Sequence, residues 1–160
     1  MNYPEFVRDF AARTQKNLDY IDKASRRKRK NPEPRVFEVT QLVNSMLGLL
    51  IFPQQEYMNR IPEIPLTELN RQGWPVIYPT HGKLPGNNLR QLVRYLRNSI
   101  AHGNLEFLPD SNTNEIIGLR VWNERRSGVK DWEAELNIKD MRELAVHFLK
   151  LLESELKVWS

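Results

Sequence analysis

The segment RNSIAHGN, residues 97–104, places an arginine, an amide and a histidine within six positions and ends in glycine and asparagine. Arginine can bind a phosphate through two parallel hydrogen bonds, and histidine can exchange a proton near neutral pH. Arg97, Asn98 and His102 could therefore act together on a phosphate ester. The same letters also fit an ordinary helix end followed by a capping glycine, so the segment alone leaves both interpretations open.

Sequence signatures of other chemistries are missing. His81, His102 and His147 form neither HExxH nor HxxxH, and there is no P-loop and no GxGxxG. We therefore expect no metal site and no cofactor, which leaves metal-free chemistry. A Ser/His/Asp triad stays open because its members need not be adjacent in the chain, although no nucleophile elbow occurs.

Spacing alone does not identify a site, because Arg142 and His147 repeat the spacing of Arg97 and His102. The two helical faces differ in charge. The face of the last helix mixes its cations with Glu143 and Glu153, which would repel a phosphate. A helix over 87–102 gathers cations, amides and the histidine, without a carboxylate, within an arc of about 140°. The members of this arc are Asn87, Arg90, Gln91, Arg94, Arg97, Asn98 and His102.

The elements that must position these residues follow from hydrophobic spacing. Strict alternation and turn residues predict a small antiparallel β insertion over about 104–137. Prolines across 53–85 predict an irregular connection with short helical turns. The expected fold class is mainly α, a single domain built as a four-helix bundle with the β insertion before its last helix. The predicted helices cover about 3–25, 35–51, 87–102 and 138–158.

Composition sets broad limits on function. The net charge of +4 and the pI of about 9.4 lean towards polyanions such as nucleic acid. The basic run Arg26 to Lys30 is expected to be a solvated loop, with an RNA-contacting patch as the open alternative. Cysteine is absent, no apolar run approaches the ~20 residues of a membrane span, and the first residues lack a signal-peptide pattern. We expect a soluble cytoplasmic protein without a membrane partner.

The motif Arg97-Asn98-x3-His102, on the third predicted helix, resembles the signature of the HEPN superfamily. That signature is an Arg, usually followed by a polar residue, then a His after four to six intervening residues. The segments RTQKNLDYI (13–21) and EVTQLVNSMLGLLIFPQ (38–54) are similar to a HEPN subgroup found on bacterial plasmids and other mobile elements. The β segment and the lack of a fused partner domain depart from the pattern.

The resemblance implies a metal-independent endoribonuclease that acts as a homodimer, with two motifs in one cleft. In such enzymes the ribose 2′-OH attacks the adjacent phosphate and yields a 2′,3′-cyclic phosphate. His102 would then be the general acid/base, Arg97 would stabilise the phosphorane, and Asn98 would orient the reacting groups. The RNA-binding residues would be Arg94, Arg90 and Asn104. A toxin or anti-phage defence role is expected, with an antitoxin or activator as a further partner.

Two alternatives belong to other functional classes. A non-catalytic HEPN module would bind RNA or protein through the same basic face and would be indifferent to the loss of His102. A purely structural bundle would dimerise without nucleic acid and would show no salt-dependent RNA binding. The intact trio of Arg97, Asn98 and His102 favours the nuclease.

Overall fold

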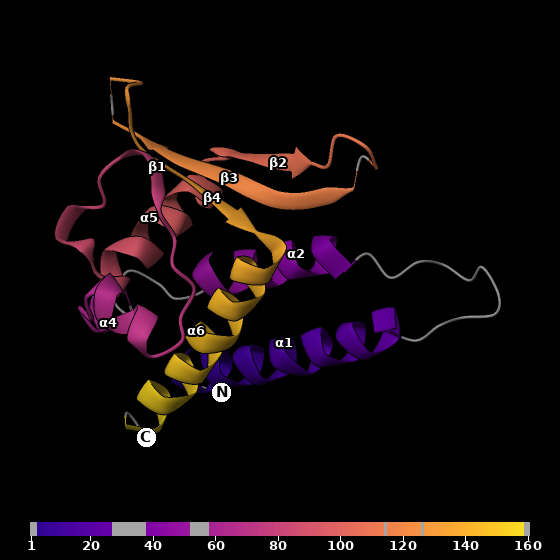
Figure 1. Ribbon diagram of the computed structural model, residues 1–160. Coiled ribbons are helices and arrows are strands. Elements are labelled where there is room, and N and C mark those ends of the chain that lie inside the picture. Colours follow the sequence, from indigo (N-terminus) through magenta and orange to yellow (C-terminus); the bar gives the residue numbers. More distant parts are fainter. Residues whose placement is uncertain (1–2, 27–37, 52–57, 114, 126, 159–160) are drawn as a thin grey trace.

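The computed structural model describes residues 3–26, 38–51, 58–113, 115–125 and 127–158. Within these residues, five α-helices accompany a four-stranded antiparallel sheet (Figure 1). The elements in chain order are α1 (Tyr3–Arg26), α2 (Glu38–Ile51), α4 (Leu66–Arg71), β1 (Pro79–Gly82), a 3-10 turn (Pro85–Asn87), α5 (Leu89–Ala101), β2 (Leu105–Pro109), β3 (Ile116–Glu124), β4 (Lys130–Asn137) and α6 (Ile138–Val158).

The sheet forms one layer and the helices lie on one side of it. Its strand order is β1-β4-β3-β2, and every pair of neighbouring strands is antiparallel. In Figure 1 the sheet is at the top, with α5 below it and α6 descending from the end of β4. Helix α5 contacts β3 on one side and α2 on another, while α1 and α2 pack against α6.

The sheet contributes side chains to the same hydrophobic core as the helices, so it is an integral part of the fold. Alternate positions of β3 and β4 are apolar and point towards the helices, as expected for a sheet with one solvated face. They pack in one hydrophobic cluster with the apolar side of α5 and with α6. The buried strand residues are Leu119, Val121, Trp132, Ala134 and Leu136.

The predicted four-helix bundle is wrong, because the fold is mixed α/β. The motif helix α5 packs against a sheet as well as against α2. The sheet also takes its edge strand β1 from the proline-rich connection, outside the predicted insertion at 104–137. The sequence of β1 is PTHG, and all four residues are exposed. Such a strand carries no hydrophobic alternation, so the pattern that reveals β2, β3 and β4 does not reveal β1.

The helix boundaries agree closely with those predicted from spacing. Helices α1 and α6 begin and end within one residue of the expected 3–25 and 138–158. Helix α5 begins later than expected because the side chain of Asn88 accepts a hydrogen bond from the Gln91 N–H at 3.0 Å and caps the helix. Residues 35–37 of the predicted second helix and residues 27–30 of the basic run lie outside the described residues.

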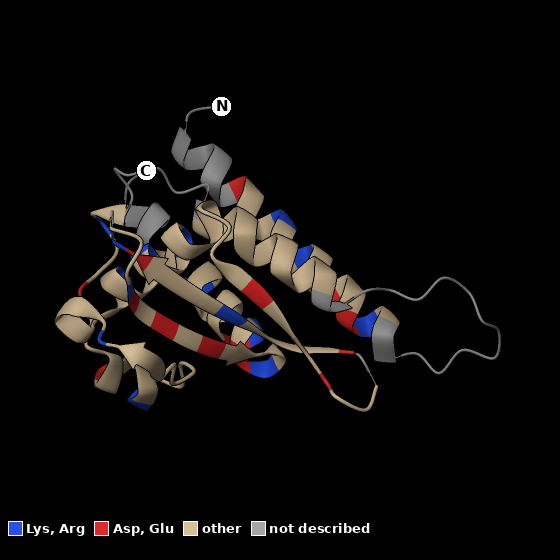
Figure 2. Ribbon diagram, turned by 90° about the horizontal axis from the view of Figure 1, so that it is seen from above, with Lys and Arg blue, Asp and Glu red and all other residues tan. Residues whose placement is uncertain are grey.

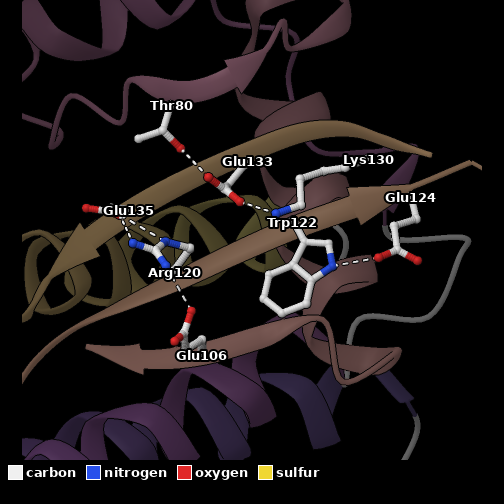
Figure 3. A network of polar contacts seen from close by, with 8 residues as sticks. All are labelled: Thr80, Glu106, Arg120, Trp122, Glu124, Lys130, Glu133 and Glu135. Carbon is white, nitrogen blue, oxygen red and sulfur yellow. Dashed lines mark hydrogen bonds and ion pairs between the residues drawn. The ribbon is translucent and has the colours of Figure 1, made fainter. Parts of the chain in front are cut away.

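The outer face of the sheet carries a network of charges that satisfy one another. Arg120 on β3 binds Glu106 on β2 at 2.9 Å and Glu135 on β4 at 2.7 Å. Glu133 bonds to Lys130 and accepts from the Thr80 hydroxyl of β1 at 3.0 Å (Figure 3). Figure 2 looks onto this face and shows both acidic and basic positions on its strands. Cross-strand pairs of this kind stabilise the strand order.

None of the helices in the described residues combines the length and the apolar character needed to cross a membrane.

Candidate functional site

Helix α5 carries the predicted site and is held rigidly from one side. Its apolar residues are buried against the sheet and α2, whereas its opposite side is partly exposed. A side-chain lock also fixes its last two turns. The Asn123 amide of β3 donates to the Tyr95 carbonyl and to the Ser99 hydroxyl oxygen, both at 2.8 Å. Ser99 is fully buried, so this lock adds directional contacts to the apolar packing.

The C-terminal end of α5 is a Schellman motif that fixes where His102 lies. The Gly103 N–H donates to the Ile100 carbonyl at 3.1 Å, and the Asn104 N–H donates to the Ser99 carbonyl at 2.8 Å. Gly103 has φ = 73°, the left-handed conformation that this motif requires. The Asn104 carbonyl then accepts from the Trp122 N–H at 3.1 Å, which ties the helix end to β3. His102, the C-cap residue, is exposed at this junction.

The other motif residues are half-buried and make few contacts. The Arg97 Nε atom is buried and has no hydrogen-bond partner in the described part of the chain. No hydrogen bond or ion pair among the described residues involves the side chains of Asn98, Arg94 or His102. At helical spacing Arg97 and His102 leave α5 about 140° apart. A single chain therefore offers these two groups to a ligand but does not join them.

Arg90 differs from its neighbours on the polar arc because it is already engaged. Its Nε donates to the Ile61 carbonyl at 2.6 Å, and its guanidinium forms an ion pair with Glu63. Both partners come from the connection before α4, which sequence spacing on one helix does not reveal. Arg90 thus anchors α5 to that connection, while Arg94 is left without an ion pair among the described residues.

The second Arg–His pair of the sequence has structural partners. Arg142 forms an ion pair with Asp22 on α1. The His147 ring stacks on Trp74 with ring centroids 5.0 Å apart and an interplanar angle of 27°. Both side chains hold α6 against its neighbours, which supports the preference for the α5 motif.

Near the motif lies a further polar side chain, Tyr95, together with Asp131 of β4, and neither was predicted from the sequence. Tyr95 lies seven residues before His102, hence on the same side of α5, and its ring meets Trp132 edge-on at 5.6 Å. Burial raises the pKa of Tyr95, and the negative charge of Asp131 raises it further. The phenol is therefore a neutral hydrogen-bonding group. The seven-residue spacing was visible in the sequence, but the approach of Asp131 depends on strand pairing.

No group of three or more His, Cys, Asp or Glu side chains within the described residues is placed to hold a metal ion.

A family model described as HEPN pEK499 p136 matches residues 1–158. No curated protein and no solved structure matches the chain significantly.

Proposed function

The chain belongs to the HEPN pEK499 p136 family, and from this premise we propose that it is a metal-independent endoribonuclease. It acts as a homodimer whose two α5 motifs share one RNA-binding cleft. Its biological setting is a toxin or an anti-phage defence system, with an antitoxin or an activator as the regulating partner.

One observation carries the proposal. The side of α5 that holds the motif presents Arg94, Arg97, Asn98 and His102, and none of these side chains has a hydrogen-bonded or ion-paired partner among the described residues. Arg90, Arg120 and Arg142, by contrast, form ion pairs with residues of neighbouring elements. A buried, unpartnered guanidinium nitrogen such as Arg97 Nε calls for a ligand, and a phosphate oxygen would satisfy it.

The roles of the residues follow from their chemistry. His102, exposed at the helix end, removes the proton of the ribose 2′-OH or protonates the leaving 5′ oxygen. Arg97 donates to the phosphate oxygens, on which negative charge builds in the transition state. Asn98 orients the ribose or the phosphate through its amide. Arg94 attracts the neighbouring phosphates, with Asn104 at the edge of the cleft and Arg90 contributing less because Glu63 already neutralises it.

The test compares purified wild-type protein with His102→Ala on mixed RNA, with EDTA present throughout. We expect the wild type to produce 2′,3′-cyclic phosphate ends and His102→Ala to lose at least a hundredfold in rate, the usual scale for a general acid/base. His81→Ala is the matched control, because His81 is also exposed but lies on β1, outside the motif. It should cleave like the wild type.

Two other outcomes separate the alternatives. If the wild type and His102→Ala both bind RNA equally and neither cleaves it, a non-catalytic binding module accounts for the family membership better. Equal cleavage by both proteins would place any activity outside the α5 motif.

A further inference from the structure

A β-bulge at the start of β4 turns one carboxylate out of the regular pattern of the sheet. Asn123 pairs with Trp132 and Glu124 pairs with Lys130, so Asp131 has no opposite residue on β3. Bulges re-aim side chains and are frequent beside active sites. The Asp131 side chain is 23 % exposed, and its Oδ1 atom is buried without a hydrogen-bond partner in the described part of the chain.

Asp131 is close enough to the motif helix α5 for its charge to affect a side chain there. The negative charge of Asp131 helps to raise the pKa of Tyr95 on α5, whereas the positive charges of Arg125 and Arg94 lower the pKa of the same group. Its Oδ2 atom lies 3.6 Å from the Arg125 Nε atom. The Arg125 side chain is 72 % exposed, so it can follow an incoming ligand. The two arginines also reduce the repulsion that a carboxylate would exert on an RNA phosphate.

The bulge is connected to the motif by the side-chain lock described above. Asn123, which stands opposite the bulge, holds the Tyr95 carbonyl and the Ser99 hydroxyl. Tyr95, Asn98 and His102 follow one another at intervals of three and four residues, so they line one side of α5. Asp131, which adjoins Trp132, therefore lies near Tyr95, two helical turns before His102 on the same side of α5.

We propose that Asp131 is a specificity-determining residue, which accepts a hydrogen bond from a donor group of a nucleotide next to the scissile phosphate. This inference rests on the proposed function and extends it to sequence preference. Two donors fit a carboxylate acceptor: the exocyclic amine of a base, such as cytosine N4, or a ribose hydroxyl. An acceptor left unpaired in a buried place is costly, so the correct donor is favoured over an analogue that lacks it.

The test uses the His102→Ala protein, so that RNA is bound but not cut, and fluorescence anisotropy with short labelled homopolymers. At position 4 of the base, oligocytidine carries an amine that donates a hydrogen bond and oligouridine carries a carbonyl oxygen that accepts one. Oligo-2′-deoxycytidine keeps the amine but lacks the ribose 2′-hydroxyl. If the amine is the donor, we expect a preference of roughly tenfold for oligocytidine over oligouridine. Adding Asp131→Ala, which removes both carboxylate oxygens, should abolish this preference. If the ribose hydroxyl is the donor, Asp131→Ala instead removes the preference for oligocytidine over its deoxy form.

The matched control is Glu133→Ala, the same truncation two residues along β4, where the side chain contacts Thr80 and Lys130 on the outer face of the sheet. It should leave both preferences intact. Thermal melting verifies the fold of each protein, and Asp131→Leu serves as a second variant if Asp131→Ala does not fold. Preferences that survive both Asp131 variants overturn the inference, since Oδ1 would then be satisfied by a buried water. Absence of binding to all three polymers overturns it as well.

Cleavage by the wild-type protein distinguishes failure of this inference from failure of the proposed function. A protein that cuts RNA without an Asp131-dependent preference keeps the nuclease and loses the inference. A protein that shows the preference but never cuts RNA keeps the inference and loses the nuclease.

Discussion

At the scale of single residues, some charged side chains form ion pairs that stabilise the fold, whereas others have no partner among the described residues. Glu133 belongs to the first kind. The hydrogen bond from Lys130 lowers the pKa of Glu133, with a further contribution from the Thr80 hydroxyl. Because the folded pKa lies below the ordinary value of 4.5, the stabilisation is present above that value and is lost as pH falls through the folded pKa.

We therefore expect Glu133→Gln to lower the free energy of unfolding at neutral pH by about 1 kcal/mol, which corresponds to about 2–4 °C in melting temperature. The difference between wild type and variant should shrink as the pH falls below 4.5 and through the lowered pKa of Glu133, because the carboxyl group then becomes protonated. Melting curves across this range measure it. Glu115→Gln is the control, since no ion pair of Glu115 occurs among the described residues and its loss should change little. A difference that persists undiminished in acid contradicts the electrostatic explanation.

At the scale of elements, the end of α5 decides where His102 lies. Gly103 combines a φ of 73° with open space, because a Cβ atom there would meet nothing within 4 Å. Gly103→Ala therefore introduces backbone strain alone, at a cost of about 1 kcal/mol, and shifts the position of His102 relative to Arg97. We expect a modest loss of melting temperature together with a tenfold or larger loss of RNA cleavage, measured on the same preparation.

Gly73→Ala is the matched control for Gly103→Ala. Gly73 also has a positive φ, of 84°, and a Cβ atom added there would meet only the Cε1 atom of His147, at 4.0 Å. It should lose similar stability and keep full cleavage activity. Equal losses of activity in both variants would mean that general destabilisation, and not the placement of His102, is responsible.

The sequence predicted elements better than it predicted their arrangement. Amphipathic spacing was sufficient for α1, α5 and α6, because each buries a wide apolar stripe. Gly103 was recognisable as a helix stop from its position after His102. The edge strand β1 was not recognisable, since PTHG owes its conformation to pairing with β4.

The same contrast applies to the candidate site. Arg97, Asn98 and His102 are neighbours in the chain, so one helix brings them together. The engagement of Arg90 with Glu63 and the bulge at Asp131 depend on contacts between distant segments. Patterns within one segment of the sequence cannot predict contacts between segments that are far apart in the chain.

At the scale of the whole molecule, the geometry of α5 bears on assembly. Arg97 and His102 leave the helix on different flanks and form no hydrogen bond with each other within the described part of one chain. A homodimer with a shared cleft would supply both groups to one phosphate, and we expect light scattering to give a mass of twice 18.9 kDa. Co-expression of Arg97→Ala chains with His102→Ala chains should restore part of the cleavage activity, because mixed dimers retain one intact copy of each residue.

The comparison needs each variant alone as its control, and both should be inactive. A monomeric mass, or mixed protein as inactive as either variant, contradicts the shared cleft and would require one chain to supply the whole site.

The pairing of β1 with β4 has a consequence for protein synthesis. Helix α5 lies in the chain between β1 and the hairpins that form the rest of the sheet, so its anchors at Asn123 and Trp122 are made after the helix itself. When the ribosome has added His102 to the chain, the motif has been synthesised but the β3 residues that hold α5 in place have not. The motif helix therefore gains its anchors only after β3 has been synthesised, and the sheet is complete only when β4 pairs with β1 from the other side of the helix in the chain. A partly synthesised chain thus contains the whole motif without the contacts that hold it in place.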